Sequence, residues 1–123
     1  MAELPALIPS TFSAILDETL PDAMVNALVW QALGYQQRED GKWDNSAVSD
    51  TWRQDYPEPP NFIDSRPATI KLTRSIPDSD KQLLKEQLGF QGYQISELTP
   101  RRTRRATAVN WLLSFLKSSQ PQA

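Results

Sequence analysis

The stretch TPRRTRRATAVNWLLSFL, residues 99–116, ends in the longest dense apolar run of the chain, residues 109–116. Thr99 is a suitable helix N-cap, and Pro100 fits the first helical position, where its missing N–H leaves no bond unmade. The apolar residues that follow predict one helix that ends near Leu116 and is buried along most of its length. Trp111 lies within this apolar stripe, and Trp30 lies within an earlier one, so both are predicted to belong to the core.

Four further helices are predicted upstream of this stretch. Apolar residues at helical spacing indicate helices over 11–19, 23–33 and 80–88. Ser10 is the expected N-cap of the first, and Gly34 and Gly89 are expected to end the other two in the left-handed conformation. A short helix after Ser49 must stop near residue 55, because the sequence YPEPP at 56–60 requires extended geometry.

Strand signals occur at three places. Residues 35–39 and 42–44 flank Asp40-Gly41, a pair suited to a two-residue hairpin turn that places Glu39 opposite Lys42. Residues 68–75 alternate between apolar and polar side chains, as a half-buried strand does. Residues 90–96 predict another strand, with Phe90 and Tyr93 on opposite faces. Such alternation indicates that one sheet face is open to solvent or to a partner.

Together these elements predict an α+β fold, with a small antiparallel sheet of three or four strands and helices packed on one face. Residues 1–9 are expected to be a flexible N-terminal segment, 10–117 a single α+β domain and 118–123 a disordered C-terminal tail. A chain of 123 residues is long enough for one domain with a real core.

The composition argues against an enzyme. The chain has no Cys and no His, which excludes the common triad nucleophiles and thiolate or imidazole metal sites. Four aspartates could supply a carboxylate pair or a Mg²⁺ site, but their spacing matches no motif: Asp44, Asp50, Asp55 and Asp64. We therefore expect no catalytic residues, no metal and no cofactor. The absence of a secretory signal, a membrane-spanning stretch and cysteine predicts a soluble, cytoplasmic protein.

Charge is distributed unevenly along the chain. Residues 1–64 carry 11 acidic and 3 basic side chains, whereas residues 65–123 carry 4 acidic and 10 basic ones. Four of the basic residues fall in the first turns of the predicted C-terminal helix, where the helix dipole disfavours cations: Arg101, Arg102, Arg104 and Arg105. Such a placement requires compensation by the protein's own carboxylates (Asp44, Asp50, Asp55, Glu58 and Asp64 are available), by an acidic protein partner, or by nucleic acid.

An aromatic and proline-rich segment is the second candidate for function. It contains Trp43, Trp52, Tyr56 and Phe62, with prolines at 57, 59 and 60. Aromatic residues beside prolines often line grooves that receive extended peptides. The alternative is a loop that its own aromatic residues fasten to the core.

The whole chain resembles a small, uncharacterised family of cyanobacterial proteins, a domain of unknown function. The resemblance covers nearly all of residues 10–117 and is carried by WD at 43–44, YPEPP at 56–60, RPAT at 66–69, LTRSIP at 72–77, KQLLK at 81–85 and RRTRRATAVNWLL at 101–113. That family has no established active site, so no functional residues carry over. The resemblance implies a cyanobacterial cytoplasm and a role near photosynthetic or carbon-fixing machinery, such as a carboxysome assembly chaperone.

Three functional hypotheses follow. The first is a non-enzymatic assembly factor that docks a short segment of a partner protein, on an exposed sheet edge such as 68–75 or in the aromatic–proline groove, with the arginines steering acidic residues. The second is RNA or DNA binding through the same arginines. The third, a carboxylate-dependent enzyme, requires at least two acidic side chains gathered in one pocket.

Overall fold

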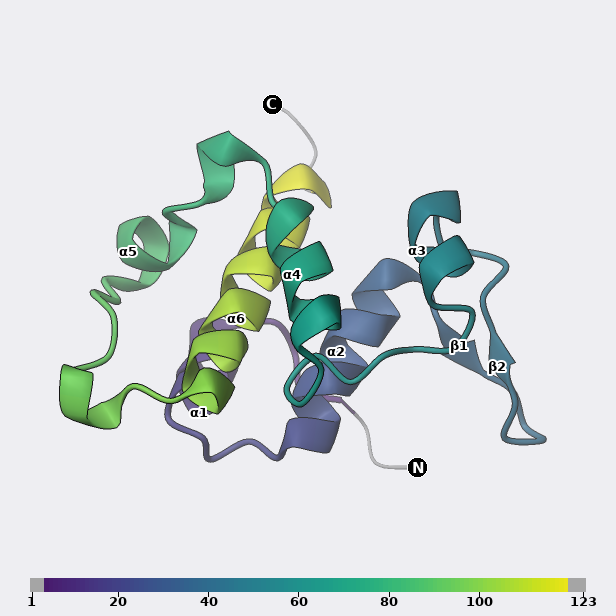
Figure 1. Ribbon diagram of the computed structural model, residues 1–123, viewed down its shortest axis with the longest axis horizontal. Helices are drawn as coiled ribbons and strands as arrows, with labels where there is room; N and C mark the ends of the chain where they lie inside the picture. Colours follow the sequence, from purple (N-terminus) through teal and green to yellow (C-terminus); the bar gives the residue numbers. More distant parts are fainter. Residues whose placement is uncertain (1–3, 120–123) are drawn as a thin grey trace.

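The computed structural model describes residues 4–119 (Figure 1). The elements follow one another as α1 (Pro9–Leu16), α2 (Asp22–Leu33), β1 (Gln36–Gln37), β2 (Trp43–Asp44), α3 (Asp50–Asp55), α4 (Arg66–Arg74), the 3₁₀ turn η1 (Asp78–Asp80), α5 (Leu83–Leu88), the 3₁₀ turn η2 (Ile95–Glu97) and α6 (Pro100–Ser119). Helices dominate this architecture.

The long C-terminal helix α6 is the centre of the molecule. It contacts α1, α2, α4 and α5, and in Figure 1 α4 and α5 stand on either side of it. Three of its residues, Ala108, Val109 and Leu112, have no exposed surface, and Trp111 is also buried. The predicted start is confirmed, since the hydroxyl of Thr99 accepts the N–H of Arg102 at 3.1 Å.

The prediction of a sheet with three or four strands and helices on one face is wrong. Within residues 4–119 there is one two-stranded antiparallel sheet, β1–β2. Residues 68–74 of the predicted strand belong to helix α4, and Ser75 is its C-cap. Ser65 is the N-cap, and its hydroxyl accepts the N–H of Ala68 at 3.4 Å. Ala68 and Leu72 are four residues apart, a spacing that puts two side chains on the same face of a strand and also on the same face of a helix. Both are buried on one face of α4.

The second predicted strand, residues 90–96, is also wrong. This segment is irregular and leads into η2. Phe90 and Tyr93 form an edge-to-face contact with ring centroids 5.1 Å apart. In the predicted strand these two side chains would point to opposite faces and could not touch. The hydroxyl of Tyr93 donates to the carbonyl of Leu16 at 2.9 Å, which fastens the segment to the end of α1.

The predicted hairpin is present, but its register differs by one residue. Gln37 pairs with Trp43, and the N–H of Arg38 donates to the carbonyl of Lys42 at 2.8 Å. The loop therefore has three residues, 39–41, and Gly41 takes a positive φ of 84° at its end. This is a tight turn followed by a left-handed residue, the next most common hairpin connection after the two-residue turn.

The observed helices differ from the predicted ones mainly in where they begin and end. The first begins at Pro9 after Ile8 rather than after Ser10, and the predicted helix 80–88 divides into η1 and α5. Helix α6 continues to Ser119, so residues 118 and 119 of the predicted tail are helical. The rest of that tail, 120–123, and residues 1–3 of the predicted N-terminal segment lie outside the described residues.

Gly34 ends α2 in the left-handed conformation, as predicted, with φ of 109°. A Cβ atom at this position would lie 2.7 Å from the carbonyl oxygen of Ala47, whereas one at Gly41 would meet nothing within 4 Å. The two glycines thus share a positive φ but differ in the room around them.

We therefore expect Gly34→Ala to destabilise the protein more than Gly41→Ala does. Both changes strain the backbone by about 1 kcal/mol, and the contact with Ala47 adds roughly 1–3 kcal/mol at Gly34 only. Urea denaturation followed by tryptophan fluorescence measures the difference. Equal midpoints for the two variants would contradict the close packing of this helix end.

Candidate functional site

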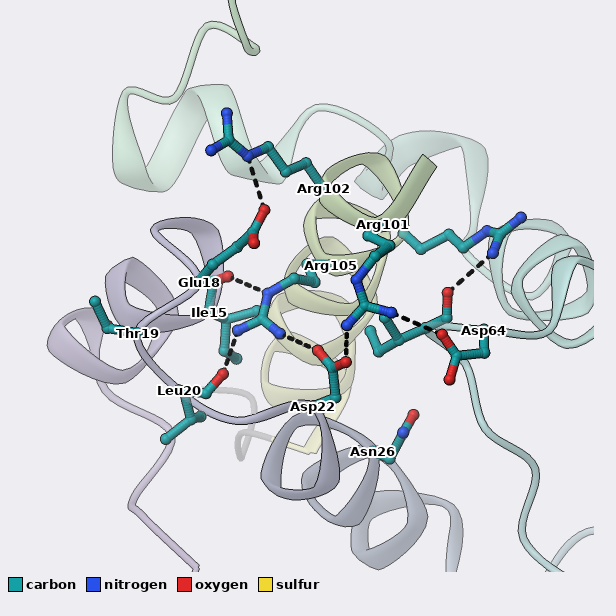
Figure 2. A network of polar contacts seen from close by, with 12 residues as sticks. Ile15, Glu18, Thr19, Leu20, Asp22, Asn26, Asp64, Arg101, Arg102 and Arg105 are labelled. Carbon is teal, nitrogen blue, oxygen red and sulfur yellow. Dashed lines mark hydrogen bonds and ion pairs between the residues drawn. The ribbon is translucent and has the colours of Figure 1, made fainter. Parts of the chain in front are cut away.

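Arg105 is the most deeply buried charged residue of the arginine cluster. Its side chain comes from the second turn of α6, and the residue is only 2% exposed. Its guanidinium donates to the carbonyl of Ile15 at 2.7 Å, to the carboxylate of Asp22 at 2.5 Å and to the carbonyl of Leu20 (Figure 2). Burial lowers the pKa of Arg105, with Glu18 opposing that shift. This side chain ties α6 to the turn between α1 and α2.

Two neighbouring arginines also meet the protein's own carboxylates (Figure 2). Arg101 pairs with Asp22 and, at 2.7 Å, with Asp64. Arg102 pairs with Glu18 at 2.7 Å, and this hydrogen bond raises the pKa of Arg102. Carboxylates of the protein itself therefore neutralise three of the four arginine charges at the start of α6. Of the five carboxylates named from the sequence, only Asp64 is one of these partners.

Arg104 differs from the other three arginines. It donates to the carbonyl of Ile63 at 2.9 Å, but it forms no ion pair with a carboxylate of residues 4–119. It lies on the side of α6 that faces α4, beside Arg66 and Ile70. Of the four candidate arginines, Arg104 is the one whose charge stays available to a partner.

We expect Arg105→Gln to destabilise the protein by about 3 kcal/mol or more, because it removes a buried cation and leaves two carbonyl oxygens without donors. Arg104→Gln is the matched control from the same helix, and we expect it to cost less than about 1 kcal/mol. Thermal and urea denaturation of the two variants make the comparison. A folded Arg105→Gln protein of unchanged stability would refute the structural role.

The four candidate aromatic residues are divided between the core and a groove. Phe62 is 1% exposed and packs edge-on against Trp52, with ring centroids 5.8 Å apart. Trp43 packs edge-on against Trp30 at 5.4 Å, and the indole N–H of Trp30 donates to the carbonyl of Pro60 at 2.6 Å. Phe62 and Trp43 therefore fasten the proline-rich loop and the hairpin to the core.

Trp52 and Tyr56 come together at the wall of an open groove between α3 and α4, with a volume of about 520 Å³. We call it the aromatic groove, and it is lined by Thr51, Trp52, Asp55, Tyr56, Lys71, Arg74 and Ser75. The ammonium of Lys71 lies 5.1 Å from the ring centroid of Trp52 and pairs with Asp55 at 2.7 Å. Trp52 is only 5% exposed, so the aromatic surface open to the groove comes mainly from the half-buried Tyr56. Arg74 lines the same groove and has no ion-pair partner within residues 4–119.

The aspartates considered for catalysis are dispersed among separate contacts. Asp44 accepts the N–H of Ser46, which lowers the pKa of Asp44, and Asp50 pairs with Arg53. Asp55 and Asp64 pair with Lys71 and Arg101. Among the described residues no group of three or more acidic side chains could hold a metal ion, and no helix there is long and apolar enough to cross a membrane.

Sequence reasoning missed one buried carboxylate, Asp80, because its partners lie far along the chain. Asp80 accepts hydrogen bonds from Lys117 at 2.6 Å and from Ser114 at 2.7 Å. These two bonds lower the pKa of Asp80 below its ordinary value of 3.8. Asn110 adds a bond to the Asp80 carbonyl at 3.1 Å, so this cluster fastens η1 to α6.

Asp80 should give the protein an acid-sensitive component of stability. Because the folded pKa lies below the unfolded one, the contribution is complete above about pH 5 and disappears as the pH falls through the folded value. We expect Asp80→Asn to be less stable than the unaltered protein at pH 7, with the gap narrowing below about pH 4. Urea titrations between pH 7 and pH 3 measure the gap, and one that widens on acidification would be the contrary outcome.

The structure as described defines a small, mainly helical domain with paired internal charges and an open aromatic groove. Residues 6–117 match a family model described as a domain of unknown function, DUF1823, and the chain belongs to that family. This confirms the expectation of an uncharacterised family. A solved structure described as "Solution NMR structure of the protein" is 57% identical, with a TM-score of 0.81, and the match covers 98% of this chain and all of the other. No curated protein matches.

Proposed function

We propose that this protein is a non-enzymatic binding module that docks a short acidic segment of a partner protein in the aromatic groove. One observation carries the proposal: Tyr56, whose ring packs against the buried Trp52, lies in an open groove that Arg74 also lines, and Arg74 has no ion-pair partner within residues 4–119. Aromatic walls with a nearby cation fit a peptide that carries apolar side chains and carboxylates.

The rigidity of the groove supports this role. The hydroxyl of Tyr35 donates to the carbonyl of Tyr56 at 2.6 Å, and the side-chain amide of Asn45 donates to the carbonyl of Pro57 at 2.9 Å. These bonds hold the YPEPP loop behind the groove. A groove that is already formed loses little conformational entropy when a ligand enters.

The proposal also covers where in the cell the protein acts, and here it rests on the family resemblance. We propose that the protein acts in a cyanobacterial cytoplasm, as an assembly factor or chaperone for the carboxysome or a photosynthetic complex, which is what the resemblance implies. The dispersed and paired carboxylates favour a binding role over catalysis.

RNA or DNA binding is the second candidate. It receives less support, because Arg101, Arg102 and Arg105 already pair with Asp22, Asp64 and Glu18. A protein that binds phosphates needs cations whose charge is free to displace counterions.

The test is affinity purification of the tagged full chain from its native cell, followed by binding measurements with the recovered protein. We expect Arg74→Glu to weaken binding about tenfold or more, and we expect the affinity of the unaltered chain to fall as salt rises. The matched control is Lys85→Glu, which makes the same change of charge at an exposed lysine of α5 that has no ion-pair partner among the described residues.

Recovery of nucleic acid without a protein partner would favour the second candidate. Equal loss of binding in Arg74→Glu and Lys85→Glu would also refute the aromatic groove, because only the net charge would then matter.

A further inference from the structure

A second open surface lies on the opposite side of α4 from the aromatic groove. Two adjoining hollows of about 440 Å³ and 280 Å³ follow α6 where it faces α4 and α5. Thr103 lines both of them, so the two hollows meet at this residue and together follow the first three turns of α6. We call this surface the α4–α6 trough, and its principal lining residues are Arg66, Ile70, Leu98, Thr103, Ala106 and Leu84.

The trough is more apolar than its many threonines imply. The hydroxyl of Thr73 donates to the carbonyl of Thr69 at 3.0 Å, and the hydroxyl of Thr107 donates to the carbonyl of Thr103 at 3.1 Å. The hydroxyl of Thr69 donates in turn to the carbonyl of Phe62 at 2.5 Å. Since these hydroxyl protons are already engaged, the side chains offer a ligand mainly their methyl groups.

One end of the trough carries a strongly exposed apolar side chain, and a second lies three residues earlier in the chain. Leu98 lines the trough and is 58% exposed, and Ile95, three residues earlier, is 92% exposed. Large apolar side chains that stand this far into solvent beside a hollow are typical of interaction surfaces.

The charged residues that line the trough are all basic. Its charged lining residues are Arg66, Lys81 and Arg104. Arg66 and Arg104 have no carboxylate partner among residues 4–119, and Lys81 pairs only with the exposed Asp78 at 3.4 Å. Glu97, next to Leu98 in the chain, lies 3.9 Å from the guanidinium of Arg102. A ligand for this surface therefore combines apolar and acidic groups.

We propose that the α4–α6 trough binds an amphipathic helix of another protein whose apolar face is flanked by acidic residues. The lining residues of α6 from Thr99 to Asn110 span roughly 16 Å, which is the length of three helical turns. The apolar face of such a helix covers Ile70, Ala106 and Leu84, and its carboxylates meet Arg66, Arg104 and Lys81. This surface is separate from the aromatic groove and does not depend on it.

The test uses the full chain, labelled with ¹⁵N, and two synthetic 14-residue peptides. Both carry leucines at helical i, i+3, i+4, i+7 spacing, and the remaining positions are mainly Glu in one peptide and Lys in the other. We expect the acidic peptide to shift the amide resonances of Thr73, Thr103 and Ala106 and the basic peptide to leave them unchanged. We expect the shifts to diminish at high salt.

A pair of charge-matched variants tests the location. Arg66→Glu combined with Thr103→Glu changes two exposed trough residues and should weaken binding of the acidic peptide at least tenfold. Lys85→Glu combined with Ser13→Glu makes the same change in net charge at exposed helical positions elsewhere and should have no such effect. Circular dichroism and the amide spectrum show that each variant is folded.

Three outcomes overturn the proposal. The first is the absence of shifts at the trough residues with millimolar acidic peptide. The second is that shifts occur at Trp52 and Tyr56 alone, which assigns the peptide to the aromatic groove. The third is that a single-stranded RNA oligonucleotide moves the trough resonances while the acidic peptide does not.

Discussion

A buried guanidinium is the constraint on which the rest of this structure depends. The guanidinium of Arg105 is buried, so its donors need acceptors within the protein. Each of its three nitrogens donates one hydrogen bond, to the carbonyls of Ile15 and Leu20 and to the carboxylate of Asp22. These three acceptors belong to the end of α1, the turn that follows it and the start of α2. The requirement therefore fixes where the N-terminal helices lie on α6, and Glu18, held at a positive φ of 63° between them, comes within reach of Arg102.

Helix α4 connects the core to both open surfaces. Its buried residues Ala68 and Leu72 pack toward the interior, while Lys71 and Arg74 line the aromatic groove and Ile70 and Thr73 line the α4–α6 trough. The helix is thus the shared wall of two hollows. A ligand that moves α4 in one of them alters the shape of the other.

Sequence patterns predicted the parts of this fold in which local chemistry and burial agree. Helix α6, helix α2 with its end at Gly34, and the burial of Trp111 follow from capping residues and apolar spacing. Helix α4 was missed because short apolar alternation fits a strand as well as a helix, and the cap at Ser65 with Pro67 in the first turn was the signal that separates them. Of the carboxylates that pair with the arginines, Asp64 was named from the sequence, but Glu18 and Asp22 were not. Glu18 lies 84 residues from Arg102, and Asp22 lies 83 residues from Arg105, so no local pattern connects them.

The position of α6 in the chain affects how the protein is made. During synthesis, α1, α2, α4 and α5 leave the ribosome before the helix that covers their apolar faces, and Arg105 reaches its acceptors only after those acceptors have waited in solvent. Until α6 has been synthesised, the nascent chain exposes apolar surface that is prone to aggregation. In cells that produce the protein rapidly, we therefore expect general molecular chaperones to bind the nascent chain until residues 100–116 have been synthesised.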